Sequence, residues 1–136
     1  MPLPFALCLA LLLAATHLSG ASADAGTVLR AGAAVTDVTP EKLPVIVNCF
    51  MTERVVERIT SRLYARSLVL DDGASMRLAI TVVDSCMLPR ELLDRAKAIA
   101  AKRTGIREDR MLISATHTHM APAAMGCLGS DAQQDY

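Results

Sequence analysis

The sequence predicts an α/β domain with a mixed sheet, in which a β-hairpin is followed by a βαβ unit. Residues 63–84 contain two apolar runs around Asp72 and Gly73, and an Asp-Gly step between such runs is a strong hairpin signal. Residues 90–105 carry a helical apolar stripe between two strand-like runs. Strand, helix and strand in this order place two parallel strands side by side, with the helix across one face.

The first strand of this sheet is expected within residues 30–40. This stretch, RAGAAVTDVTP, alternates small and branched side chains and stops at Pro40, which lacks the N–H that a strand ladder requires. Residues 41–62 have no clean hydrophobic period. We interpret them as a long loop that contains a strand or turn of undefined position.

The remaining elements follow in order. Residues 77–84, RLAITVVD, are almost continuously apolar, as expected of a central strand that is covered on both faces. Residues 110–119, RMLISATHTH, return as the parallel strand. Between them, the segment after Pro89 predicts a helix that ends near Gly105. Its apolar stripe consists of Leu92, Leu93, Ala96, Ile99 and Ala100.

Residues 1–23 are predicted to be a secretory signal peptide that leaves a domain of residues 24–136. Residues 5–18 are apolar but short for a membrane span, and Ala21, Ser22 and Ala23 provide the small residues that signal peptidase requires. The alternatives are an N-terminal membrane anchor or a buried helix. Cleavage implies that the protein is secreted or periplasmic.

The charge balance and the cysteine spacing argue against nucleic-acid binding and against a zinc ribbon. The chain has 14 basic and 14 acidic residues, so no net charge attracts it to nucleic acid. After the predicted signal, Cys49, Cys86 and Cys127 remain. Their spacing fits no zinc-ribbon pattern, and an odd number permits at most one internal disulfide bond. We interpret them as small, buried, apolar residues.

His117 and His119 lie at the expected end of the parallel strand. If residues 111–119 stay extended, both imidazoles face one side, with Cβ atoms about 6–7 Å apart. Neutral imidazole is a good zinc ligand, and a catalytic zinc needs about three protein ligands. Asp84 ends the neighbouring strand at the same edge, where ligands of α/β sheets collect. It is either a third ligand, an acceptor that orients one imidazole, or a turn or cap residue.

Four stretches carry a family resemblance: RAGAAVTDVTP, LYARSLVLDDG, ITVVDSCMLPRELLDRAKAIAAKRTGI and RMLISATHTHMAP. In this order and spacing they resemble the N-terminal domain of the neutral/alkaline non-lysosomal ceramidase family. The resemblance implies a zinc-dependent hydrolase that cleaves the amide of an N-acyl sphingoid base, such as ceramide. It also implies that His117 binds the Zn²⁺ ion and that the catalytic residue His119 lies beside the reacting amide.

The same resemblance implies a partial protein. Members of the family are several times longer, and their other zinc ligands and their nucleophilic serine lie downstream of this segment. We therefore expect an N-terminal fragment that is inactive by itself. A lipid amide substrate also implies peripheral contact with a membrane. The chain departs from the family at residues 120–122, where Met-Ala-Pro replaces Ser-Gly-Pro, and at residues 43–54, where a Gly-Tyr turn is missing.

Two alternatives belong to other classes. One is a different His-x-His metallohydrolase, but a metallo-β-lactamase-like protein would continue with Asp-His where this chain has Met120 and Ala121. An amidohydrolase would place the pair after its first barrel strand, whereas here a hairpin and a βαβ unit come first. The other alternative is a small secreted α/β binding module without catalysis, which predicts no dependence on metal.

Overall fold

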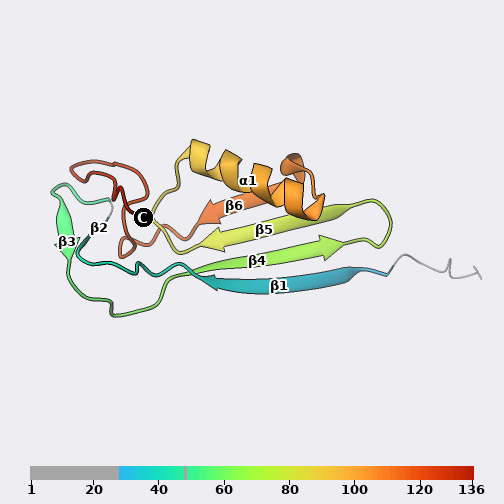
Figure 1. The fold of residues 1–136 in the computed structure, drawn as a ribbon, viewed down its shortest axis with the longest axis horizontal. Coiled ribbons are helices and arrows are strands. Elements are labelled where there is room, and N and C mark those ends of the chain that lie inside the picture. The colour runs from blue at the N-terminus through green and yellow to red at the C-terminus, as the bar shows by residue number, and fades with distance from the viewer. Residues whose placement is uncertain (1–27, 48) are drawn as a thin grey trace, which may run out of the picture.

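A computed structural model of the chain describes residues 28–47 and 49–136 and shows a mixed four-stranded sheet with one α-helix (Figure 1). The strand order is β1-β4-β5-β6, in which β1, β4 and β5 are antiparallel neighbours and β6 is parallel to β5. The predicted α/β fold class, with a hairpin followed by a βαβ unit, is confirmed. The elements are β1 (Arg30–Asp37), β4 (Tyr64–Asp71), β5 (Arg77–Val83), α1 (Arg90–Thr104) and β6 (Met111–Ala115).

The hairpin between β4 and β5 turns at the predicted Asp-Gly step. Gly73 adopts a left-handed conformation with φ of 75°, which glycine tolerates without steric cost. The Oδ1 atom of Asp72 accepts hydrogen bonds from the backbone N–H groups of Ala74, Ser75 and Met76, at 2.9, 3.0 and 2.9 Å. These bonds, that of Met76 foremost, hold the pKa of Asp72 below its usual value.

Helix α1 has the predicted bounds. It follows Pro89 and ends at Gly105, whose φ of 70° allows its N–H to donate to the carbonyl of Ala101 at 2.9 Å. The helix lies over β5 and β6 (Figure 1). None of its residues is buried, and Leu92 and Ile99 of the predicted stripe are 41% and 51% exposed.

One face of the sheet is open to solvent. Leu68, Ile80 and Leu112 lie opposite one another across β4, β5 and β6 and are 38%, 37% and 58% exposed. On the other face, Met111 is buried. The prediction that the strand of residues 77–84 is covered on both faces is therefore wrong for the part of the chain that the structure describes.

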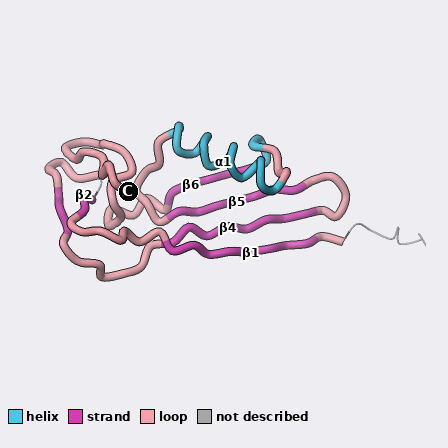
Figure 2. Tube along the Cα trace, in the orientation of Figure 1, coloured by secondary structure: helices cyan, strands magenta, loops and turns pink. Residues whose placement is uncertain are grey.

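Most of the buried residues lie beyond the carboxyl ends of β5 and β6, in an end of the molecule that is mostly loop (Figure 2). Residues 41–62, predicted as a long loop, contribute two short antiparallel strands, β2 (Val45–Val47) and β3 (Arg54–Val56). Val47 also forms a bridge with Pro122. This pairing depends on residues far away in the sequence, which a local pattern does not reveal.

The signal-peptide prediction for residues 1–23 lies outside the described residues, as does the start of the domain predicted to begin at residue 24. Within residues 28–47 and 49–136, no helix has the length and apolar character needed to cross a bilayer.

Candidate metal centre

Strands β5 and β6 end side by side, and both of their continuations enter the loop-rich end (Figure 1). The N–H of Thr116 donates to the carbonyl of Val83 at 2.9 Å, which ties the two strand ends together. Asp84 and Cys86 follow β5, and His117 and His119 follow β6. The predicted parallel pairing, which places Asp84 and the histidine segment at one sheet edge, is confirmed; the position of Cys86 there was not predicted.

The histidine segment itself is not extended. Strand β6 ends at Ala115, and His117 has a left-handed backbone with φ of 62°, so the assumption of an extended segment through residue 119 is wrong. The two imidazoles nevertheless lie together, with ring centroids 5.0 Å apart and planes at 86°. His117 is exposed and His119 is half-buried.

A backbone carbonyl orients His117. Its Nδ1 atom lies 3.0 Å from the carbonyl oxygen of Cys86. Because a carbonyl only accepts, Nδ1 carries the proton in the neutral ring, and Nε2 keeps its lone pair. Metal-binding histidines commonly donate their second nitrogen in this way. The arrangement suits the predicted ligand role of His117.

Aromatic contacts position His119. Its ring meets the ring of Phe50 edge to face, with centroids 5.7 Å apart. The guanidinium of Arg54, in β3, lies 4.3 Å from the centroid of Phe50, a distance at which a cation is attracted to an aromatic face. The segment between β2 and β3 therefore supports the second histidine.

Asp84 lies against β4. Its Oδ2 atom accepts hydrogen bonds from the N–H of Tyr64 and from the guanidinium of Arg66, both at 2.9 Å. Burial acts to raise the pKa of Asp84, but these donors outweigh it and hold the pKa below its usual value. Because the carboxylate of Asp84 already accepts these two hydrogen bonds, it is suited to hold the end of β5 against β4.

Two cysteines come to lie beside His119. The Sγ atoms of Cys49 and Cys86 and a ring nitrogen of His119 all lie within 4.8 Å of one another. Cys86 is 2% exposed, whereas Cys49 and His119 are half-buried. The interpretation of the cysteines as small, buried residues describes Cys86, but no sequence pattern indicated this cluster.

Cys127 adjoins the cluster from the C-terminal segment. The thiols of Cys49 and Cys127 interact. Burial is the main cause that raises the pKa of Cys127, and the contact with Cys49 is the second. The pKa of Cys49 is also raised, first by burial and then by the thiol of Cys86, and these effects outweigh the opposite effect of the thiol of Cys127. None of the three cysteines is in a disulfide bond. The described part of the chain thus gathers three thiols and two imidazoles in one place.

The fold is similar to that of a neutral ceramidase. The solved structure of neutral ceramidase from Pseudomonas aeruginosa matches with a TM-score of 0.63 and 25% sequence identity, over 72% of this chain and 16% of that chain. This chain therefore spans about a sixth of the length of that ceramidase. No family model matches the sequence. The structural similarity supports the relationship to neutral ceramidases that the four sequence stretches indicate.

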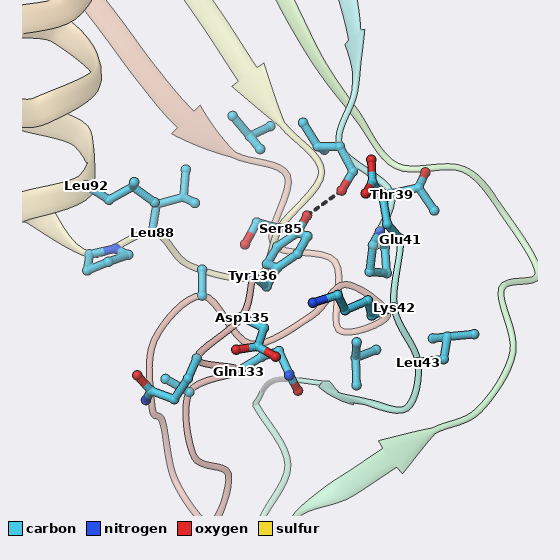
Figure 3. Close-up of a pocket in the computed structure, with 18 of the residues that line it drawn as sticks. Thr39, Glu41, Lys42, Leu43, Ser85, Leu88, Leu92, Gln133, Asp135 and Tyr136 are labelled. Carbon is cyan, nitrogen blue, oxygen red and sulfur yellow. Dashed lines mark hydrogen bonds between the residues drawn. The ribbon is translucent and has the colours of Figure 1, made fainter.

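Two hollows are lined mainly by residues of the loop-rich end. The larger, of about 1120 Å³, lies between the segment after β1 and the C-terminal residues, where the hydroxyl of Tyr136 donates to the carbonyl of Val38 at 2.7 Å (Figure 3). Its lining contains none of the thiols or imidazoles. The smaller, of about 760 Å³, is lined by Thr118 and Met120 of the histidine segment, and by apolar residues that include Leu43, Val45 and Ile59. It is the hollow that adjoins the candidate metal centre.

The chemistry of the donor set fits the metal that the ceramidase resemblance implies. Imidazole and thiol groups are the side chains that Zn²⁺ prefers. The described residues supply both kinds within one cluster. A group of this composition is suited to hold a metal ion.

Proposed function

We propose that this chain is the N-terminal part of a secreted, zinc-dependent amidohydrolase that resembles neutral ceramidase and cleaves a lipid amide. The observation that carries the proposal is the similarity to the ceramidase fold, with both histidines at the carboxyl edge of the βαβ unit. The proposed substrate is an N-acyl sphingoid base such as ceramide.

Zn²⁺ bound at this edge would polarise the amide carbonyl and lower the pKa of a bound nucleophile. His117 is suited to bind it through Nε2, because the carbonyl of Cys86 holds the proton on Nδ1. Following the resemblance, His119 lies beside the reacting amide and transfers protons. Phe50 and Arg54 keep its ring in place.

The hollow beside Thr118 and Met120 suits the acyl chain of such a substrate. Its volume of about 760 Å³ lies within the range of small-molecule sites, about 300–1,000 Å³. Much of its lining is apolar, including Val45 and Val55. A lipid would reach it from a membrane surface, so the proposed enzyme makes peripheral membrane contact.

The open face of the sheet supports the proposal of a longer protein. Leu68, Ile80 and Leu112 form a row of exposed apolar side chains, which independent domains usually cover. The other zinc ligands and the nucleophile are proposed to come from chain outside this sequence.

The test uses the complete open reading frame that contains this sequence. We expect the encoded protein to hydrolyse a fluorescent N-acyl sphingosine, to lose activity with a chelator and to regain it with Zn²⁺. His119→Ala should reduce the rate about 100-fold or more, and His117→Ala should abolish the response to Zn²⁺. Arg107→Ala is the control, since Arg107 is exposed and pairs with Asp109.

Two results would count against the proposal. One is a protein that folds yet releases no fatty acid from lipid amides with Zn²⁺ present. The other is hydrolysis that neither the chelator nor His117→Ala changes. A folded protein without hydrolysis or metal dependence would favour the alternative of a binding module.

A further inference from the structure

We infer that Cys49, Cys86 and His119 form a thiolate-rich binding site for a metal ion of the zinc class. Their donor atoms lie within 4.8 Å of one another. Ligands placed tetrahedrally around Zn²⁺, with bonds of about 2.0–2.3 Å, are separated by about 3.3–3.8 Å. Side-chain movements on the order of 1 Å therefore bring the three donors to bonding distance.

The site is assembled from three separate parts of the chain. Cys49 follows β2, Cys86 follows β5 and His119 follows β6. Two neighbouring contacts support the arrangement: the Sγ atom of Cys86 lies 3.6 Å from Nδ1 of His117, and the thiol of Cys127 interacts with that of Cys49. The three segments thus bring together thiol and imidazole groups, the donors that zinc-class ions prefer.

The backbone around the site is strained. Among the described residues, three that are not glycine have positive φ, namely Cys49 at 67°, His117 at 62° and Leu128 at 55°. Cys49 is a proposed ligand. His117 follows Thr116 at the strand ends, and Leu128 follows Cys127, whose thiol lies beside that of Cys49. Such conformations persist where the surrounding structure enforces them and are concentrated at ligand sites.

The burial of the three side chains indicates the kind of site. Cys86 is 2% exposed, whereas Cys49 and His119 are half-buried, so one side of the cluster faces solvent. Structural zinc sites have four protein ligands, and catalytic sites have three with one open position. Three donors with an accessible side match the second kind.

The donor types also determine the metal. Thiolates select Zn²⁺ and its spectroscopic substitute Co²⁺ over Mg²⁺ and Ca²⁺, which require oxygen ligands. The inference concerns this chain, in which His119 lies beside the two thiols; its proposed role beside a reacting amide belongs to the longer protein. The inference does not depend on amide hydrolysis, because metal binding is measured directly.

The experiment is a titration of the full 136-residue chain with Co²⁺, after purification with a reductant and removal of metal. We expect one equivalent to bind, with a thiolate-to-cobalt charge-transfer band in the near ultraviolet and tetrahedral bands in the visible. Zn²⁺ should displace it. Loss of a side chain that only supports a ligand lowers metal affinity by about 10–100-fold. Cys49→Ser and Cys86→Ser should each lower the affinity for Co²⁺ by more than this, and each should roughly halve the intensity of the charge-transfer band.

His119→Ala should weaken the affinity to a similar extent but retain the charge-transfer band at saturating Co²⁺. Cys127→Ser is the matched control: it removes a neighbouring thiol that lies outside the three-donor group, and should leave the band intact with less than about a 10-fold loss of affinity. Circular dichroism checks that each variant folds. Because Cys49 is half-buried, its variant is decisive if Cys86→Ser unfolds.

The inference is overturned if the reduced protein binds no Co²⁺, or if the folded Cys49→Ser variant binds it with an unchanged spectrum. It also fails if Mg²⁺ displaces Co²⁺ as readily as Zn²⁺ does. Cobalt binding with the expected spectrum supports this site even if the longer protein cleaves no amide.

Discussion

The two ends of the molecule differ in regularity and in burial. The sheet and helix contain strands of up to eight residues and a helix of 15 residues, yet β1 is exposed along its whole length and α1 has no buried residue. The loop-rich end has strands of only three residues. It nevertheless holds most of the buried residues, including Val45, Val47, Ala121, Pro122 and Ala123.

The difference shows that regular structure and burial have separate causes. Backbone hydrogen bonds and local turns define the sheet, whereas the loop-rich end is held by contacts between distant segments. Ile46 accepts a hydrogen bond from the N–H of Ala123 at 2.9 Å and donates one to the side chain of Gln133 at 2.9 Å. The candidate metal centre lies in this second region, where its side chains are supported from several directions.

The largest effect is expected where the C-terminal segment meets Phe50 and Met51. The N–H of Gly129 donates to the carbonyl of Phe50 at 3.1 Å, and a Cβ atom at position 129 would collide with the backbone of Met51. Gly129→Ala should therefore lower the free energy of unfolding by about 3 kcal/mol or more, measured by urea denaturation.

The matched control lies in the sheet. A Cβ atom at Gly32, in β1, meets no heavy atom within 4 Å, so Gly32→Ala should not lower the free energy of unfolding and should raise it by up to about 0.5–1 kcal/mol, because glycine is unfavourable inside a strand. Equal effects of the two substitutions would show that the contact between Gly129 and Met51 does not exist in solution.

A second comparison uses two valines. Val47, in β2, is 1% exposed, and Val35, in the longer strand β1, is 64% exposed. Val47→Ala should cost about 2 kcal/mol through lost burial and the cavity that it leaves. Val35→Ala should cost less than about 0.5 kcal/mol. Thermal and urea unfolding of both variants provide the measurement, and a larger cost at Val35 would contradict the assignment of the core to the loop-rich end.

A third comparison makes the same leucine-to-glycine substitution at two positions, where it should change the free energy of unfolding in opposite directions. Leu128 has φ of 55° and is 68% exposed, so Leu128→Gly relieves left-handed strain and should raise the free energy of unfolding by about 0.5 kcal/mol. Leu112 is 58% exposed in β6, and glycine there should lower it by about 0.5–1 kcal/mol. If both variants are destabilised in urea, the strain at Leu128 is not real.

The sequence predicts the sheet better than the site because the signals of the sheet are local. The Asp-Gly turn, the apolar runs and Gly105 each act within a few residues, and all three appear where predicted. The exposed stripe of Leu92 and Ile99 marks the limit of this approach. Periodicity shows which face of a helix is apolar, but not how completely another element covers it.

The site depends on distant contacts. His117 and His119 could be proposed because they are close in sequence and follow a strand. Cys49 reaches them from the end of β2 and Cys86 from the end of β5, and their spacing matches no known metal-binding pattern. His117 likewise has a left-handed backbone, and its ring contacts the carbonyl of Cys86, far away in the sequence. An extended strand through residue 119 was therefore the wrong expectation.

The smallest effect is expected at the hairpin, where sequence and structure agree most closely. The pKa of Asp72 is lowered by hydrogen bonds from the backbone amides of Met76 and Ala74, so its charged form stabilises the turn. This contribution is fully present above the usual pKa of 3.8 and is lost as the pH falls through the lowered value in the folded protein.

We therefore expect hydrogen exchange of the amides of residues 74–76 to accelerate, relative to the intrinsic rate, below about pH 4. Asp72→Asn should remove this pH dependence, because the amide side chain still accepts hydrogen bonds but does not titrate. The amide of Gly129, which donates to Phe50, provides the comparison in the loop-rich end. If its protection falls in parallel with that of residues 74–76 in both proteins, acid acts on the whole fold and the two regions are not independent.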